Sequence, residues 1–223
     1  MQALNHNLRL SAATVLALCL GSYWYSTSAE AAEVHDISKL NGGIRVDAQE
    51  RVGDVSSVNG GVDIRRGATA NDVETVNGGI KLEDEVVVTS AETVNGGIRI
   101  GRNVTVKGSL ETLNGGISTG AGTVIEESIK TANGKIRLRN TRVGSDLQTS
   151  NGDIELRDGS VVEGDLIVRG RRSWFDRFFS SHERASEIQI DSSSQVRGEI
   201  HLYRDVELRI ADDAEVGGIV RHY

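Results

Sequence analysis

The stretch Leu40-Asn41-Gly42-Gly43-Ile44 decides the fold, because close copies of it return along most of the chain. Five copies read Asn-Gly-Gly followed by Ile or Val, and two later ones read Asn-Gly-Lys-Ile and Asn-Gly-Asp-Ile. The asparagines, which are 18, 18, 18, 19, 19 and 18 residues apart, are Asn41, Asn59, Asn77, Asn95, Asn114, Asn133 and Asn151. A period this short and regular predicts a solenoid, in which each repeat stacks on the previous one.

Each Asn-Gly-Gly run is interpreted as a corner, because Asn and Gly tolerate positive φ at low cost. An Ile or Val follows the corner, and two positions later comes a second inward candidate such as Val46 or Ile64. One corner at one point of each turn stacks the strands in parallel. The sequence therefore predicts an all-β, single-stranded parallel β-helix. The asparagines could form a structural ladder of stacked amides or a ligand-binding row, and the corner chemistry favours the ladder.

A second periodicity predicts the cross-section of the solenoid. Aliphatic residues recur every six positions, as at Val46, Val52 and Val58, so a coil of about 18–20 residues would have three short faces around a triangular core. The two 19-residue spacings are expected to be absorbed as bulges at corners. Right-handed crossovers dominate parallel sheets, so a right-handed coil is expected.

The first 31 residues have the pattern of a secretory signal peptide. Arg9 precedes the apolar run 10–20, and Ala29-Glu30-Ala31 matches an A-x-A cleavage site. Export predicts a periplasmic, secreted or cell-surface location in a bacterium, with residues 32–223 as one β-helix domain. Cys19 is the only cysteine, and a lipoprotein interpretation is weakened by Leu18, where a small residue is expected.

Composition and motifs give no sign of catalysis. The net charge of −7 argues against nucleic acid as a partner. The histidines have no metal-ligand spacing, and P-loop, dinucleotide and Gly-x-Ser-x-Gly patterns are absent from the sequence. We therefore expect no catalytic residues, metal or cofactor. Glu74, Glu92 and Glu111 fall at equivalent positions, where either a cation or neighbouring Arg and Lys could offset their repulsion, and the second explanation is favoured.

One stretch, at about 169–185, breaks the repeat and is predicted to be an insertion. It concentrates aromatic and basic side chains, and the candidates for a binding role are Arg171, Arg172, Trp174, Phe175, Phe178 and Phe179. The aromatics would share one face of a short helix. They could form a lid packed on the β-helix, or a docking element for a membrane surface or partner, where Trp, Phe and Arg are favoured.

The Asn-Gly-Gly-Ile and Asn-Gly-Asp-Ile repeats behind a signal peptide resemble the bacterial adhesin-like β-strand-repeat proteins, the toast-rack group. The Val-x-Gly-x-Ile/Leu corners, notably between Val196 and Val216, are similar to those of bactofilins. The first resemblance implies an exported protein without established catalysis. The second implies end-to-end polymerisation, although the signal peptide departs from the bactofilin pattern.

Together these features predict an exported, non-enzymatic scaffold or adhesin-like protein of the cell envelope. Its partners would be a second copy stacked end to end, an envelope component or a membrane surface. A bactofilin-like polymer is the alternative. A second alternative is an enzyme, either a carbohydrate-processing β-helix or a hexapeptide acyltransferase. The former needs clustered carboxylates in a cleft, and the latter a catalytic His, and the repeats show neither.

Overall fold

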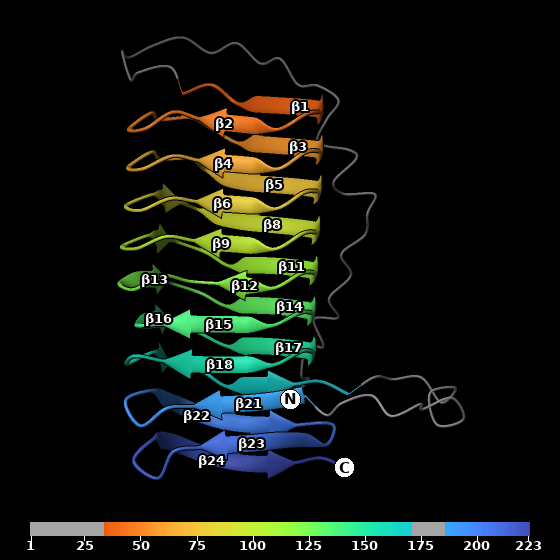
Figure 1. Ribbon diagram of the computed structural model, residues 1–223, viewed down its shortest axis with the longest axis vertical. Helices are drawn as coiled ribbons and strands as arrows, with labels where there is room; N and C mark the ends of the chain where they lie inside the picture. The colour runs from red at the N-terminus through yellow and green to blue at the C-terminus, as the bar shows by residue number, and fades with distance from the viewer. Residues whose placement is uncertain (1–33, 171–185) are drawn as a thin grey trace, which may run out of the picture. The chain divides into compact units, whose positions relative to one another are not determined.

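The structure is a computed structural model that describes residues 34–170 and 186–223, and all regular elements in these ranges are β-strands. The strands stack in successive coils along one axis, and each coil contributes strands to the same three faces (Figure 1). Every strand pairing in the described ranges is parallel. The predicted all-β parallel solenoid is therefore confirmed.

Each coil runs through a first, a second and a third face in turn. The first face contains β1 (Ile37–Asn41), β3 (Val55–Asn59), β5 (Asp72–Asn77), β8 (Ser90–Asn95), β11 (Leu110–Asn114), β14 (Ile129–Asn133), β17 (Leu147–Asn151) and β20 (Leu166–Val168). The second face contains β2 (Ile44–Val46), β4 (Val62–Ile64), β6 (Ile80–Leu82), β9 (Ile98–Ile100), β12 (Ile117–Ser118), β15 (Ile136–Arg139), β18 (Ile154–Arg157), β21 (Ser186–Ile190) and β23 (Val206–Ile210).

Short strands form the third face, which closes each coil. They are β7 (Val87–Val88), β10 (Thr105–Val106), β13 (Thr123–Ile125), β16 (Thr141–Val143) and β19 (Val161–Val162). In the last coils β22 (Gln195–Leu202) is long enough to span the third and first faces, and β24 (Glu215–Arg221) pairs with it. The stack thus continues past Val168 as far as β24.

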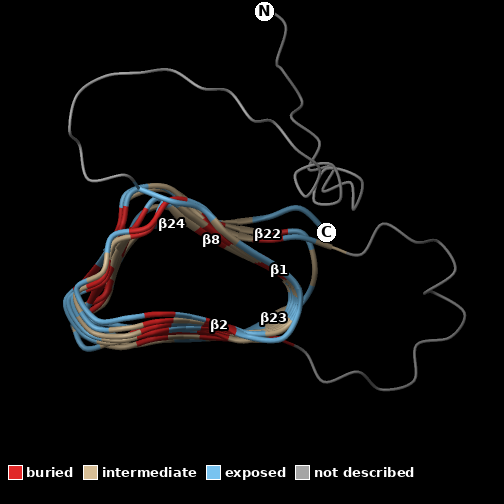
Figure 2. Ribbon diagram, turned by 90° about the horizontal axis from the view of Figure 1, so that it is seen from above, coloured by how far each residue is buried: buried red, intermediate tan, exposed pale blue. Residues whose placement is uncertain are grey.

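The core is a column of aliphatic side chains enclosed by the three faces. Figure 2 looks along the stack and shows the buried residues recurring at the same places in successive coils. The Ile or Val after each corner points inward, as Ile80 and Ile98 show, with 1% and 0% of their surface exposed. The six-residue aliphatic pattern is wrong on the first face. Val58 and its equivalents point outward there, because the inward positions are two and four residues before the asparagine, at Ser57 and Val55.

A row of hydroxyls therefore lines the inside of the first face. Buried Thr75, Thr93 and Thr112 each donate a hydrogen bond of 2.8 Å to the carbonyl of the first corner glycine of the preceding coil. A buried hydroxyl that lacks a partner costs free energy, so this repeated bond explains why Thr recurs in an otherwise aliphatic core. The bond also ties each first-face strand to a neighbouring corner.

The first corner glycine has the expected positive φ at Gly42 and Gly134, with φ of 96° and 157°, but most other coils require it for a different reason. At Gly78, Gly96 and Gly115 the φ angles lie outside the positive region. A Cβ on Gly96 would instead lie 1.9 Å from the carbonyl oxygen of Gly78 in the preceding coil. The second glycine is less confined, since a Cβ on Gly97 would lie 2.9 Å from the nearest atom. In these coils close stacking of backbones, and not φ, therefore explains why the first glycine is kept.

Positive φ is more regular at another corner, the one between the second and third faces. There it repeats once per coil with mixed residue types, at Gln49, Gly67, Glu85, Asn103, Gly122, Asn140 and Asp158. Asn and Gly adopt this conformation readily, whereas Gln and Glu do so uncommonly. Because these residues share no sequence motif, the corner carries no visible repeat.

The predicted insertion follows β20 and precedes β21, at the corner where other coils carry Asn-Gly-Gly. The candidate lid or docking residues lie outside the described residues; they are Arg171, Arg172, Trp174, Phe175, Phe178 and Phe179. The predicted signal peptide, residues 1–31, also lies outside the described ranges. Both assignments stay predictions.

Candidate functional site

The outer surface of the first face carries three parallel rows of side chains, and the asparagines form the one nearest the corner. Their amides are joined in series by five hydrogen bonds of 2.9 to 3.1 Å, which link Asn59 to Asn41, Asn77 to Asn59, Asn95 to Asn77, Asn114 to Asn95 and Asn133 to Asn114. In each bond Nδ2 donates to Oδ1 of the preceding coil. Each amide therefore keeps a second N–H for solvent or a ligand.

Asn151 ends this row differently. Its Oδ1 accepts a hydrogen bond of 3.0 Å from Arg204, which also donates to the carbonyl of Ser150. Arg204 lies two residues after Leu202, which pairs with Val168 at the end of β20. All the amides point the same way, with their oxygens toward the C-terminal end of the row. The positive charge of Arg204 complements the partial negative charge of these oxygens.

An aliphatic row runs beside the asparagines, at the residue immediately before each one from Asn41 to Asn133. Leu40 and Leu113 expose 65% and 38% of their surface, and Val58, Val76 and Val94 are half-buried. Large apolar side chains that are aligned and open to solvent are a common feature of interaction surfaces. These residues belong to the six-residue aliphatic pattern that had been expected to face the core, and on this face they form a stripe on the surface.

The third row is acidic near its middle. Glu74, Glu92 and Glu111 pair in register across adjacent strands, and the next residue, Lys130, forms an ion pair of 2.9 Å with Glu111. Burial raises the pKa of Glu92, and the carboxylates of Glu111 and Glu74 raise it further. Burial likewise raises the pKa of Glu74, with a further contribution from Asp72. Lys130 therefore neutralises Glu111 at one end of the row, whereas the carboxylates of Glu74 and Glu92 still repel each other.

The outer second face instead carries alternating charges. Asp63 lies 3.6 Å from both Arg45 and Lys81, so the charges of three successive coils compensate one another. Burial acts to raise the pKa of Glu155, but a hydrogen bond and charge from Lys135, with the charge of Arg157, outweigh burial and lower it. Opposite charges on adjacent coils of this face therefore pair with one another.

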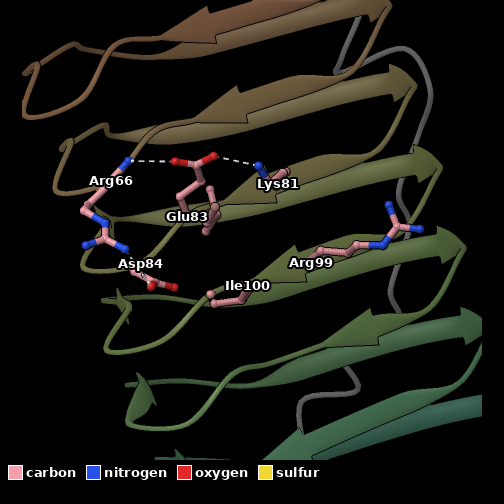
Figure 3. A pocket seen from close by; sticks show the side chains of 8 residues that line it. Arg66, Lys81, Glu83, Asp84, Arg99 and Ile100 are labelled. Atoms are coloured by element: carbon pink, nitrogen blue, oxygen red, sulfur yellow. Dashed lines mark hydrogen bonds and ion pairs between the residues drawn. The ribbon is translucent and has the colours of Figure 1, made fainter.

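A shallow depression of about 420 Å³ lies on this face, around β6 and β9 (Figure 3). In it Glu83 lies 2.6 Å from Lys81, and Asp84 lies 3.1 Å from Arg66 and 3.0 Å from Arg102. Hydrogen bonds from Lys81 and Arg102, respectively, hold the pKa of Glu83 and Asp84 below their usual range. These carboxylates are ionised and paired, an arrangement suited to structural pairing more than to proton transfer.

Across the described ranges, no group of three or more His, Cys, Asp or Glu side chains is placed to hold a metal ion. The described part of the chain also contains no helix with the length and hydrophobicity that a membrane span requires. The structure does bring together two histidines that sequence reasoning had treated as isolated, His201 and His222. Their separation of 21 residues, about one coil, was the available signal.

The first face is therefore the main candidate surface, built from amide, aliphatic and acidic rows in register. Comparison with known proteins was made at three levels. No protein-family model, no curated protein and no solved structure matches this chain, so its function has to be argued from the fold and from these surfaces.

Proposed function

We propose that the chain is an exported, non-enzymatic β-solenoid scaffold that presents its first face as an adhesin-like binding surface in the bacterial cell envelope. One observation carries this proposal. The outer first face holds an amide row and an aliphatic row side by side in register, from Asn41 and Leu40 to Asn133 and Ala132. The signal-peptide pattern in residues 1–31 supports export.

Such a surface suits an extended ligand. Parallel strands lie roughly 4.8 Å apart, so each chemical group recurs at that interval along the stack. The free N–H groups of the amides can donate to a row of acceptors, and the aliphatic row offers apolar contact beside them. A polysaccharide of the envelope has both hydroxyl acceptors and apolar ring faces. It could therefore contact several coils at once, so that individually weak contacts add up.

The charges of the second face support a non-enzymatic role. Carboxylates such as Asp84 and Glu155 are held ionised by neighbouring Arg and Lys. A general acid or base needs a pKa near the working pH and an accessible position. These pairs stabilise the wall of the solenoid and leave its charge balanced.

The binding part of the proposal is tested by cosedimentation of the mature protein with purified bacterial cell-wall polysaccharide. Val94→Lys places a charge in the aliphatic row, and Ser118→Lys is the matched control on the outer second face one coil away; both positions are outward and half-buried. We expect loss of binding with Val94→Lys and retention with Ser118→Lys. Equal binding by both variants would refute the surface assignment.

Export is tested separately. A C-terminally tagged full chain should be recovered outside the cytoplasm in fractionated cells, and a chain without residues 1–31 should remain inside. Cytoplasmic recovery of both chains would refute export and leave the binding experiment unaffected.

A second candidate is a scaffold that polymerises end to end, and one observation favours it. The inward residues of the final coil are only partly buried, among them Val206, Leu208 and Val216, and Ile219 exposes 42% of its surface. The equivalent Ile200, one coil earlier, is fully buried. Among the strands that the structure describes, β23 and β24 each pair on one side only, so each has an edge that can accept another strand.

Sedimentation velocity over a range of protein concentrations tests this candidate. Ile219→Lys would place a charge on the open end, and Val124→Lys would place one on the wall, where that valine exposes a similar 38%. Polymerisation predicts concentration-dependent association that Ile219→Lys reduces and Val124→Lys does not. A monomer at all concentrations would exclude it.

A further inference from the structure

Two histidines meet at the C-terminal end of the stack. His201 belongs to β22, and His222 directly follows β24, which pairs with β22 (Figure 1). Nδ1 of His201 lies 3.2 Å from Nε2 of His222. Within residues 34–170 and 186–223, the other polar neighbours of these rings face His201 Nε2: Glu199 Oε2 lies at 3.5 Å and Asp165 Oδ2 at 3.6 Å. The proposed function of the first face uses none of these groups.

The separation of the two nitrogens matches that of two ligands on one metal ion. Zinc binds imidazole nitrogen at about 2.0–2.1 Å in tetrahedral geometry, which puts two such nitrogens about 3.3 Å apart. We propose that His201 Nδ1 and His222 Nε2 form a two-histidine chelate for a divalent transition-metal ion. The ring centroids are 5.4 Å apart and the planes are inclined by 29°, so both rings lie close enough to share one ion.

The carboxylates beside His201 prepare it for this role. Glu199 and Asp165 both face Nε2, so the proton of the neutral ring is favoured there, and the lone pair of Nδ1 is left facing His222. A carboxylate that orients a metal-binding imidazole in this way is a frequent outer-shell arrangement. On binding, the Nε2 proton of His222 moves through solvent to its Nδ1. Two neutral imidazoles therefore bind the ion without net proton release.

His222 is also held in place, although it lies close to the chain end. Its ring stacks on Tyr203, with centroids 4.2 Å apart and planes 7° from parallel. Its backbone N–H donates to the carbonyl of Leu202 at 2.8 Å. Tyr223, the next residue, approaches Asp205 through its hydroxyl at 3.4 Å. Little ordering is therefore needed when the ion binds, which favours affinity.

The ligand set selects the kind of ion. Imidazole suits Zn²⁺, Ni²⁺ and Cu²⁺, whereas Ca²⁺ and Mg²⁺ prefer oxygen ligands. Since no third protein ligand is placed for a metal within the described ranges, water completes the coordination and the site stays open to solvent. An ion bound here would join the segment after β24 to β22, and would thereby stabilise the last strand of the stack.

The experiment is a Zn²⁺ titration of the full chain, with the imidazole ¹⁵N and ¹H resonances followed by NMR. We expect His201 and His222 to shift together and to saturate at one ion per chain, with Mg²⁺ giving no effect. His222→Gln and His201→Gln should each weaken Zn²⁺ binding by roughly tenfold or more, since loss of an outer-shell partner alone costs 10–100-fold. His35→Gln, at an exposed position near the other end, is the matched control and should bind as the unaltered chain does.

Three outcomes would overturn the proposal. The two imidazoles could shift at different Zn²⁺ concentrations, which would mean independent sites. They could respond no more strongly than His35. Finally, His222→Gln could leave binding unchanged. Because His222 is exposed and follows the last strand, that variant keeps the fold, and its result decides the question even if His201→Gln is unstable.

Discussion

Replacing Gly96 with Ala tests the physical basis of the repeat. The new Cβ would lie 1.9 Å from the carbonyl oxygen and 2.5 Å from the carbonyl carbon of Gly78. Relief of this contact requires the two backbones to separate by about 1 Å, about a fifth of the normal spacing of roughly 4.8 Å between strands. The same oxygen accepts the hydrogen bond from Thr93, so that bond is disturbed as well.

The cost can be estimated from these two effects. Forced expansion of a packed site costs about 1–3 kcal/mol, and a hydrogen bond contributes about 1 kcal/mol. Gly96→Ala should therefore lower the free energy of unfolding by about 2–4 kcal/mol. The matched control is Gly97→Ala, where the Cβ would lie 2.9 Å from the oxygen of Gly116 and a shift of tenths of an ångström suffices. We expect it to cost about 1 kcal/mol or less.

Urea unfolding followed by circular dichroism measures both variants, with midpoints and slopes compared to the unaltered chain. The repeats already point to the same ranking, since Lys135 and Asp153 occupy the second glycine position and the first glycine is never replaced. Equal losses in the two variants, or a larger loss from Gly97→Ala, would refute the argument from backbone stacking.

Three further predictions follow from particular contacts. The pKa of Glu92 is raised in the folded chain. Above the usual carboxyl pKa the folded state therefore binds more protons than the unfolded state, so the free energy of unfolding should fall as the pH rises through that range. Glu92→Gln should raise the unfolding midpoint at neutral pH and flatten its pH dependence; a lower midpoint would contradict this. Thr112→Val removes a buried bond of 2.8 Å and should cost about 1 kcal/mol. Thr149→Val should be neutral or stabilising in the same urea assay, since Thr149 Oγ1 is buried without a partner; an equal loss in both would show that the bond is unimportant. If the insertion is a lid, changing Trp174 and Phe178 to Ala should lower stability by a few kcal/mol, whereas an unchanged melt with lost binding to anionic vesicles or a partner would indicate docking.

The sequence by itself determined the repeat, the strand type and the inward residues of the second face. It could do so because one corner per coil recurs at a fixed interval, and the residue after it, such as Ile80 or Ile98, must then turn into the core. The charges between those inward residues were also predictable. Alternation along a strand places them outside, and registered stacking pairs Arg45 with Asp63.

The tertiary structure decided which face of the first strand is inside. A six-residue aliphatic period fits either side, and only stacking shows that Thr75 bonds to a corner carbonyl inside while Val76 lies outside. Stacking likewise explains the first glycine of corners such as Gly78 and Gly96, because a Cβ there would meet the backbone of the preceding coil. The φ preference of an isolated turn does not reveal this contact. The meeting of His201 with His222 depends on register between the last coils, where the Asn-Gly-Gly repeat has already ended. Residues that touch across adjacent coils are a whole turn apart in the sequence, so rules based on neighbouring residues did not predict these contacts.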